Sequence, residues 1–155
     1  MDLSFYPSPV GRLALIGEGD TLTGVALPGY PVPLIAPRET PVLRETRRQL
    51  EAYFAGKLRE FDLPLHLEGS PFRMKVWKEL QRISYGQAIS YGELAQRIGQ
   101  PGAARAVGGA NHNNPIAIIV PCHRVIAADG TIGGYGGGLD CKQQLLALEG
   151  IKYIK

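Results

Sequence analysis

The sequence predicts an α/β protein of two lobes, the first rich in β-structure and the second mainly helical. Three observations favour this division of the 155 residues. Alternating and β-branched segments dominate residues 1–69, capped helical segments dominate residues 70–155, and Gly69-Ser70-Pro71 separates the two patterns. A chain of this length can bury a modest core in one or two such lobes. We therefore expect domains at 1–69 and 70–155.

The N-terminal lobe should contain a hairpin, a helix and a further strand. Residues 12–16 and 21–27 are apolar segments on either side of a glycine-containing turn, which is the pattern of two paired strands. Five prolines in residues 28–41 predict an irregular connection. A helix should cover residues 42–54, where apolar side chains recur near helical spacing. Apolar and polar residues alternate over 61–67, which predicts a half-buried strand, and the proline within it favours an edge.

The C-terminal lobe should consist of helices. Ser70 can cap a first helix that has proline at its first position, and Ser90 with Glu93 forms a capping box before a second. A break rich in glycine and proline then precedes residues 103–111, a third helical segment with small side chains. Helix, break and helix form the outline of a helix-turn-helix, although many antiparallel helix pairs share it. A last helix should begin at Asp140 as its cap.

Composition excludes several classes of protein. No apolar run approaches the ~20 residues of a membrane span, and the N-terminus lacks the pattern of a secretory signal. The apolar fraction of 45% argues against disorder. Two cysteines and three scattered histidines provide neither a disulfide framework nor zinc-finger spacing, so we expect the cysteines to be thiols. We expect no cofactor. We expect a soluble, cytoplasmic protein.

The net charge of +3 conceals an asymmetry between the lobes. Residues 1–69 carry seven Lys and Arg against nine Asp and Glu, whereas residues 70–155 carry ten against five. A basic second half fits a polyanionic partner, and chance scatter of surface charge fits the count equally well.

The segment 114–125 carries the chemistry. A β-branched apolar run ends at Pro121 and is followed by Cys122, His123 and Arg124. A thiol is nucleophilic as the thiolate, so a reactive cysteine needs a base or positive charge nearby. Neighbours in an extended strand point to opposite faces, so His123 reaches Cys122 only if the chain turns or a water intervenes. The same residues also fit a buried, inert cysteine beside a solvated histidine and arginine.

The motif Pro121-Cys-His-Arg-Val125 resembles the active-site signature of the O6-alkylguanine-DNA alkyltransferases, the methylated-DNA–protein-cysteine methyltransferases. The resemblance covers residues 70–150 and extends to the N-terminal lobe in outline. It implies an N-terminal ribonuclease-H-like sheet lobe and a C-terminal winged-helix-like lobe with a helix-turn-helix. Other segments match the family in order and spacing: Ser90-Tyr-Gly-Glu-Leu-Ala95, Ala103-Ala-Arg-Ala-Val-Gly-Gly-Ala110, Asn114-Pro115, Gly134-Tyr135, Gly137-Gly138 and Leu145-Leu-Ala-Leu-Glu-Gly150.

The resemblance implies direct, irreversible DNA repair, in which Cys122 accepts an alkyl group from O6-alkylguanine, with O4-alkylthymine as a further candidate substrate. His123 would link a water at the thiol to the carboxylate of Glu149, a triad with water inserted. Asn114 would brace the active-site turn. Tyr91 would donate a hydrogen bond to the departing guanine. The thioether product cannot be hydrolysed, so each molecule acts once.

The resemblance also implies how duplex DNA is bound. The helix of small side chains would enter the minor groove, and Arg105 would occupy the space left by the extruded base. The partner would be double-stranded DNA with alkylated bases, bound by a monomer without a metal or a membrane. The implied DNA-binding residues are Tyr91, Ala104, Arg105, Gly108, Gly109 and Arg124. The implied pocket residues are Val125, Tyr135 and Gly136, where Gly136 would leave room for bulky adducts. Cys141 should be a bystander thiol.

Two other functions remain open at this point. Alkyltransferase-like proteins, which bind lesions without catalysis, share the helix-turn-helix and the pocket but lack the cysteine, so Cys122 argues against this function. A cysteine hydrolase could use Cys122 and His123, but it would need neither Arg105 nor the basic second half of the chain.

Overall fold

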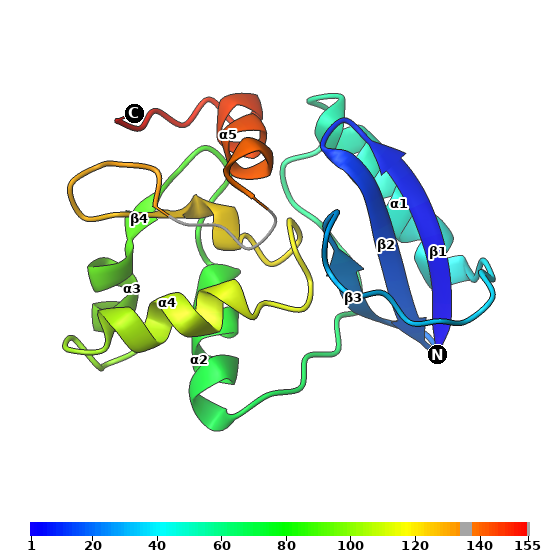
Figure 1. Ribbon diagram of the computed structural model, residues 1–155, viewed down its shortest axis with the longest axis horizontal. Helices are drawn as coiled ribbons and strands as arrows, with labels where there is room; N and C mark the ends of the chain where they lie inside the picture. The colour runs from blue at the N-terminus through cyan, green and yellow to red at the C-terminus, as the bar shows by residue number, and fades with distance from the viewer. Residues whose placement is uncertain (134–137, 155) are drawn as a thin grey trace. The chain divides into compact units, whose positions relative to one another are not determined.

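The computed structural model describes residues 1–133 and 138–154, and it confirms the α/β class (Figure 1). The chain forms two compact units. One comprises Met1–Leu67 with Pro115–Ala117, and the other comprises Glu68–Asn114 with Ile118–Lys155. The sequence placed the boundary after residue 69, and it did not indicate that 115–117 would join the first unit.

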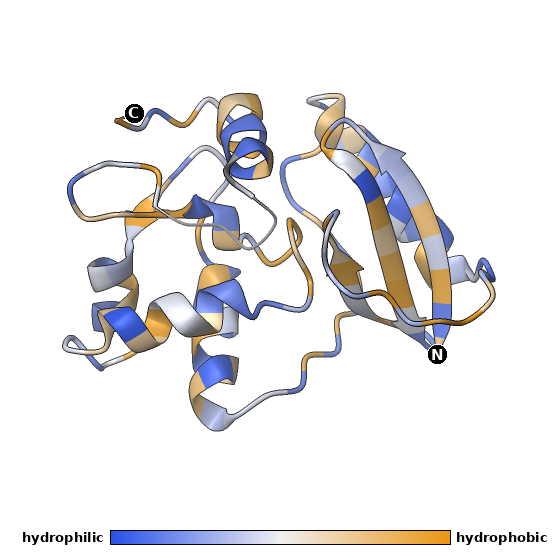
Figure 2. Cartoon of the chain, viewed as in Figure 1, coloured by the Kyte–Doolittle hydropathy of each residue, from blue (hydrophilic) through white to orange (hydrophobic). Residues whose placement is uncertain are grey.

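A three-stranded antiparallel sheet forms the first unit, in the order β1 (Asp2–Ser8), β2 (Gly11–Glu18), β3 (Thr21–Ala26). The expected hairpin is β2 and β3, whereas β1 is an additional strand that the sequence analysis missed. Its Pro7 obscures the strand pattern but lies at the sheet edge, where a missing N–H is tolerated. Figure 2 shows the apolar stretch along β2, whose Leu13 and Leu15 are fully buried.

The helix α1 (Pro41–Phe54) packs on this sheet. Thr40 caps it by accepting a hydrogen bond from the N–H of Leu43, and Pro41 occupies the first position, where its fixed φ suits a helix. Leu43 and Leu50 are fully buried on the face that meets the strands.

Residues 61–67 do not form the expected strand. They keep the alternation of half-buried and exposed side chains, but they pair with β3 only through an isolated bridge between Leu22 and Leu65. The N–H of Leu22 donates to the carbonyl of Pro64, which has no N–H with which to extend a ladder. The segment 115–117 bridges the same strand, since Val25 donates to the carbonyl of Pro115 at 3.0 Å.

In its described residues the second unit contains helices and one short parallel pair of strands, β4 (Ile89–Ser90) and β5 (Val125–Ile126). Its core includes Trp77, whose indole N–H donates to the carbonyl of Ala110 at 2.9 Å. None of the helices in the described residues is long and apolar enough to cross a membrane. The helices are α2 (Pro71–Leu80), α3 (Tyr91–Arg97), α4 (Ala104–His112) and α5 (Leu139–Leu148).

Two of the expected helix caps are present and one is not. Ser70 accepts from the N–H of Arg73, and Ser90 accepts from the N–H of Glu93. Asp140 is not the cap of α5, because the helix already begins at Leu139. The preceding residue is Gly138 with a φ of 95°, a backbone conformation that favours glycine. Asp140 instead lies in the first turn, where a negative charge complements the helix dipole.

Candidate active site

Cys122 lies at the start of a tight turn. The N–H of Cys122 donates to the carbonyl of Val120 at 2.8 Å around Pro121, which has the φ and ψ of an inverse γ-turn. One 3₁₀ turn, Cys122–Arg124, follows. Upstream, Ile118 has a φ of 70°, an outlier for a β-branched residue and a sign of stored backbone strain. The chain therefore turns at the proline, as a contact between neighbouring Cys and His side chains requires. Cys122 is buried, with 5% of its surface exposed.

A buried carboxylate organises the residues that follow Cys122. Nε2 of His123 lies 2.7 Å from Oε2 of Glu149, and both side chains are fully buried. Arg124 donates to both carboxylate oxygens, through Nε at 2.7 Å and a terminal nitrogen at 3.1 Å. The backbone N–H of Gly86 donates to Oε1 as well. A buried carboxylate held by this fork-like pairing is stabilised as an anion.

His123 is arranged as a base. Burial lowers the pKa of its imidazole, and the hydrogen bond to Glu149 opposes that effect in part. An ionised carboxylate can only accept, so Nε2 carries the proton and Nδ1 of the neutral ring has a lone pair. Nδ1 is buried and has no hydrogen-bond partner among the residues that the structure describes. This nitrogen can therefore accept a proton from a thiol or a water.

Arg124 occupies a different place from the one that the sequence analysis expected. A DNA contact needs an exposed guanidinium, whereas Arg124 is only 6% exposed. Besides Glu149, it donates to the carbonyl of Ile83 at 2.7 Å, and its guanidinium lies over the ring of Tyr85. The sequence alone could not show this, because the partners of Arg124 are distant along the chain. Arg124 therefore forms an internal ion pair that orients Glu149, and the expected DNA contact is not supported by its burial.

Tyr91 lies near the thiol, at the first position of α3. The pKa of its phenol is raised, mainly by burial and further by the charge of Cys122, which places the two groups within electrostatic range. Gly133 approaches the ring closely: a Cβ there would lie 3.3 Å from the Tyr91 hydroxyl, and its φ of 73° also favours glycine. On the other edge of the ring, a Cβ on Gly108 in α4 would lie 3.9 Å from Cδ1 and Cε1 of Tyr91.

Two asparagines hold the backbone of the turn. Nδ2 of Asn114 donates to the carbonyl of Val120 at 2.8 Å, which agrees with the bracing role that the resemblance implied. Nδ2 of Asn111 donates to the carbonyl of Cys122 at 3.2 Å, and the sequence analysis did not single out this residue. An asparagine directly after the run of small residues Gly108-Gly109-Ala110 was the signal that could have indicated it.

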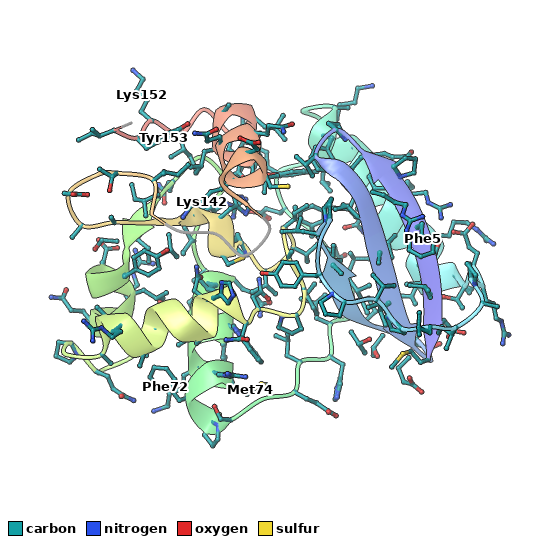
Figure 3. The ribbon with its side chains drawn as sticks, in the orientation of Figure 1. Phe5, Phe72, Met74, Lys142, Lys152 and Tyr153 are labelled. Carbon is teal, nitrogen blue, oxygen red and sulfur yellow. The ribbon has the colours of Figure 1, made fainter. Side chains whose placement is uncertain are left out.

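Lys142 is a second residue that the sequence analysis missed. It lies on α5 (Figure 3), is fully buried, and donates to the carbonyl of Val125 at 2.7 Å. Burial lowers the pKa of its ammonium to about 8, against the attraction of Cys122. A cation within electrostatic range of a thiol favours the thiolate. The sequence signal for the burial of Lys142 was the spacing: residues three apart lie on the same face of a helix, and Leu145 on that face is buried.

Four of the expected DNA-binding residues lie on α4 and reach solvent. Arg105 and Gly109 are exposed, and Ala104 and Gly108 are half-exposed. A Cβ on Gly109 would meet nothing within 4 Å, so the fold itself does not require glycine there. Tyr135 and Gly136 lie outside the described residues.

No cluster in the described residues is suited to hold a metal ion. Cys141 is a buried thiol in the first turn of α5, and burial raises its pKa, which makes it a poor nucleophile at neutral pH.

Comparison with known proteins agrees with this geometry. Residues 1–67 match the family model of the 6-O-methylguanine DNA methyltransferase ribonuclease-like domain, and residues 71–151 match that of the DNA binding domain. The methylated-DNA–protein-cysteine methyltransferase of Mycolicibacterium paratuberculosis is 54% identical over 92% of this chain and 88% of its own length. The methyltransferase of the same name from Methanosarcina acetivorans is 47% identical over 97% of this chain and 99% of its own length.

Solved structures give the same answer. The crystal structure of Mycobacterium tuberculosis OGT in complex with DNA superposes with a TM-score of 0.91 at 49% identity, covering 96% of this chain and 92% of that one. The two family models together span nearly the whole sequence, and the motif around Cys122 lies within the second. The chain therefore belongs to the methylated-DNA–protein-cysteine methyltransferase family.

Proposed function

We propose that this protein repairs DNA by transferring an alkyl group from O6 of guanine to Sγ of Cys122, once per molecule. The observation that carries the proposal is the arrangement of His123, which directly follows Cys122 at the turn. Glu149 holds Nε2 of its imidazole and leaves Nδ1 available as an acceptor. A nucleophile, a base and a group that orients the base are the components of nucleophilic catalysis. Relatives named as methylated-DNA–protein-cysteine methyltransferases support the same reaction.

The transfer is a displacement at the alkyl carbon. The thiol proton passes through a water to Nδ1 of His123, so that Sγ attacks as the thiolate. The bond from sulfur to the alkyl carbon forms as the bond from that carbon to O6 breaks, and the electron pair goes to the purine. A hydrogen bond from the Tyr91 phenol stabilises the charge that develops there. Lys142 supports the thiolate before the attack, and the stable thioether that results ends the activity of the molecule.

The DNA would be bound through α4 in the minor groove. Its exposed or half-exposed small residues allow close approach to the duplex, and the groove carries little sequence information, as a repair protein that acts at any sequence requires. The damaged nucleotide must leave the base stack, because the alkyl carbon is inaccessible to in-line attack within it. Arg105 would fill the space that the base leaves. We propose that the protein acts as a monomer in the cytoplasm.

The decisive experiment weighs the protein after incubation with a duplex containing O6-methylguanine. The wild type and Cys141→Ser should each gain one methyl group, mapped by peptide analysis to Cys122, and Cys122→Ser should gain none. Stable binding of the duplex by the wild type without a mass change would support a lesion-binding protein instead. Hydrolytic turnover in the absence of DNA would support the hydrolase.

Adduct size gives a second test. With glycine at position 136, the pocket should admit bulky adducts. Gly136→Ser should therefore slow repair of O6-benzylguanine more than repair of O6-methylguanine. An unchanged ratio of the two rates would contradict this reading of the pocket.

A further inference from the structure

Asn111 connects α4 to the residue that carries the nucleophile. Its side chain is 5% exposed, and its Nδ2 donates to the carbonyl of Cys122 across a separation of eleven residues. The same carbonyl also accepts the N–H of Val125. A carbonyl oxygen has two lone pairs, so both acceptor positions of Cys122 are engaged.

This carbonyl belongs to the peptide unit that joins Cys122 to His123. Because a peptide unit is planar, holding its oxygen sets the orientation of the Cα atoms on both sides. The donor on Asn111 therefore acts on the nucleophile and on its base together. An error of about 1 Å in such a geometry can cost ~100-fold in rate.

The surroundings of the amide oxygen of Asn111 show that this side chain is not the most stabilising choice at its position. Oδ1 is buried and has no hydrogen-bond partner among the described residues. An unsatisfied buried acceptor destabilises a fold, whereas leucine would fill a similar volume without that cost. An asparagine at this position is explained by what its N–H does.

The position of Asn111 on α4 adds a second consequence. The helix exposes Arg105 and Gly109 and buries Asn111, and the indole of Trp77 fixes its last turn through the carbonyl of Ala110. A single helix thus carries the proposed DNA contacts on one side and a hydrogen bond to the nucleophile on another.

We propose that Asn111 is a positioning residue for alkyl transfer, which holds the peptide between Cys122 and His123 in its reactive orientation from the helix that contacts DNA. The inference rests on the proposed function of Cys122. It assigns the effect to the N–H donor of the side chain and not to its oxygen.

The test separates the rate of transfer from the affinity for DNA. Single-turnover methylation of Cys122 is measured at saturating O6-methylguanine duplex in the wild type, Asn111→Leu and Asn111→Asp. The leucine variant removes donor and acceptor, whereas the aspartate variant keeps the size and an acceptor but, when ionised, cannot donate. Asn113→Ala is the matched control, because Asn113 is exposed at the end of the same helix and donates only locally, to the carbonyl of Gly109.

Both Asn111 variants should react about 10- to 100-fold more slowly at saturation, with a Kd for the duplex within about twofold of wild type. Asn111→Leu should melt at the wild-type temperature or above it, and Asn113→Ala should react normally. This split between rate and affinity is not expected from a residue that only stabilises α4. Should Asn111→Leu fail to fold, Asn111→Ser, which is too short to reach the carbonyl, carries the same test.

Three results would overturn the proposal. In the first, Asn111→Leu transfers the methyl group as fast as wild type. In the second, Asn111→Leu is slow while Asn111→Asp, at a pH where its carboxyl is ionised, reacts as fast as wild type, which would assign the effect to the oxygen. In the third, rate and DNA affinity fall together. If Cys122 of the wild type is not methylated, the proposed function fails, and this inference fails with it. If the wild type reacts and Asn111→Leu reacts equally fast, only this inference fails.

Discussion

The substitution Arg124→Met tests whether Arg124 forms an internal ion pair or contacts DNA. The substitution removes a guanidinium that donates to both oxygens of Glu149 and to the carbonyl of Ile83, and its side chain is only 7% exposed. Solvent therefore screens the interaction little. Breaking a buried pair by removing one partner costs about 3 to 5 kcal/mol, because the other charge stays buried. Glu149 keeps the hydrogen bonds from His123 and Gly86, so we expect the lower part of that range.

A loss of roughly 3 kcal/mol is a large share of the 5 to 15 kcal/mol by which domains are typically stable. For a chain of this size it corresponds to a fall in Tm of about 6 to 12 °C. Urea unfolding at pH 7 should show a lower midpoint with an unchanged slope. The folded variant should bind duplex DNA with wild-type affinity and the same salt dependence.

Arg105→Met is the control with the opposite expectation. Its side chain is exposed, so stability should change by less than about 0.5 kcal/mol while duplex affinity falls. The reasoning about Arg124 would be refuted if Arg124→Met unfolded within ~1 kcal/mol of wild type and its dependence of log Kd on log salt lost about one unit, the signature of a phosphate contact.

Further predictions follow from the buried groups Lys142 and His123 and from Gly109 on α4. Lys142→Met should slow alkylation of Cys122 by iodoacetamide at pH 7, with a smaller ratio above pH 8, where the wild-type lysine loses its charge. Because the folded pKa of about 8 lies below the unfolded value near 10.4, the unfolded chain binds more protons between them. The wild type should therefore gain up to roughly 3 kcal/mol of stability relative to Lys142→Met as pH rises through that window, and parallel urea-unfolding curves would contradict this. Folding lowers the pKa of His123 below the value near 6.5 of the unfolded chain, so the unfolded chain binds an additional proton as the pH falls below 6.5. The stability of the wild type should therefore decrease below that pH, and the stability of His123→Asn should depend less on pH. Gly109→Ala should stabilise α4 by about 0.5 to 1 kcal/mol, since the added Cβ meets open space, whereas Gly109→Gln should keep that stability and weaken duplex binding in fluorescence anisotropy. Wild-type affinity in Gly109→Gln would exclude α4 from the DNA interface.

The features that the sequence by itself determined depend on residues close together in the chain. The sequence predicted the hairpin of β2 and β3 and the helix caps at Ser70 and Ser90, because each depends on local hydrogen bonding and backbone preference. The contiguous motif that contains Cys122 and His123 indicated the chemistry for the same reason. Where pairing needed a distant partner, as in residues 61–67, the local pattern predicted a strand and the structure has a single bridge.

The tertiary structure alone decided what the buried polar residues do. The sequence around Arg124 is equally compatible with a surface charge, and only the folded chain brings Glu149, 25 positions away, beside it. Asn111 and Lys142 gave no motif, and their partners lie 11 and 17 positions away along the chain. Whether a polar side chain binds a ligand or holds the protein together depends on its burial and on the groups opposite it. Both are properties of the packed chain, because the free energy of a charge or an amide in an interior is set by its neighbours in space.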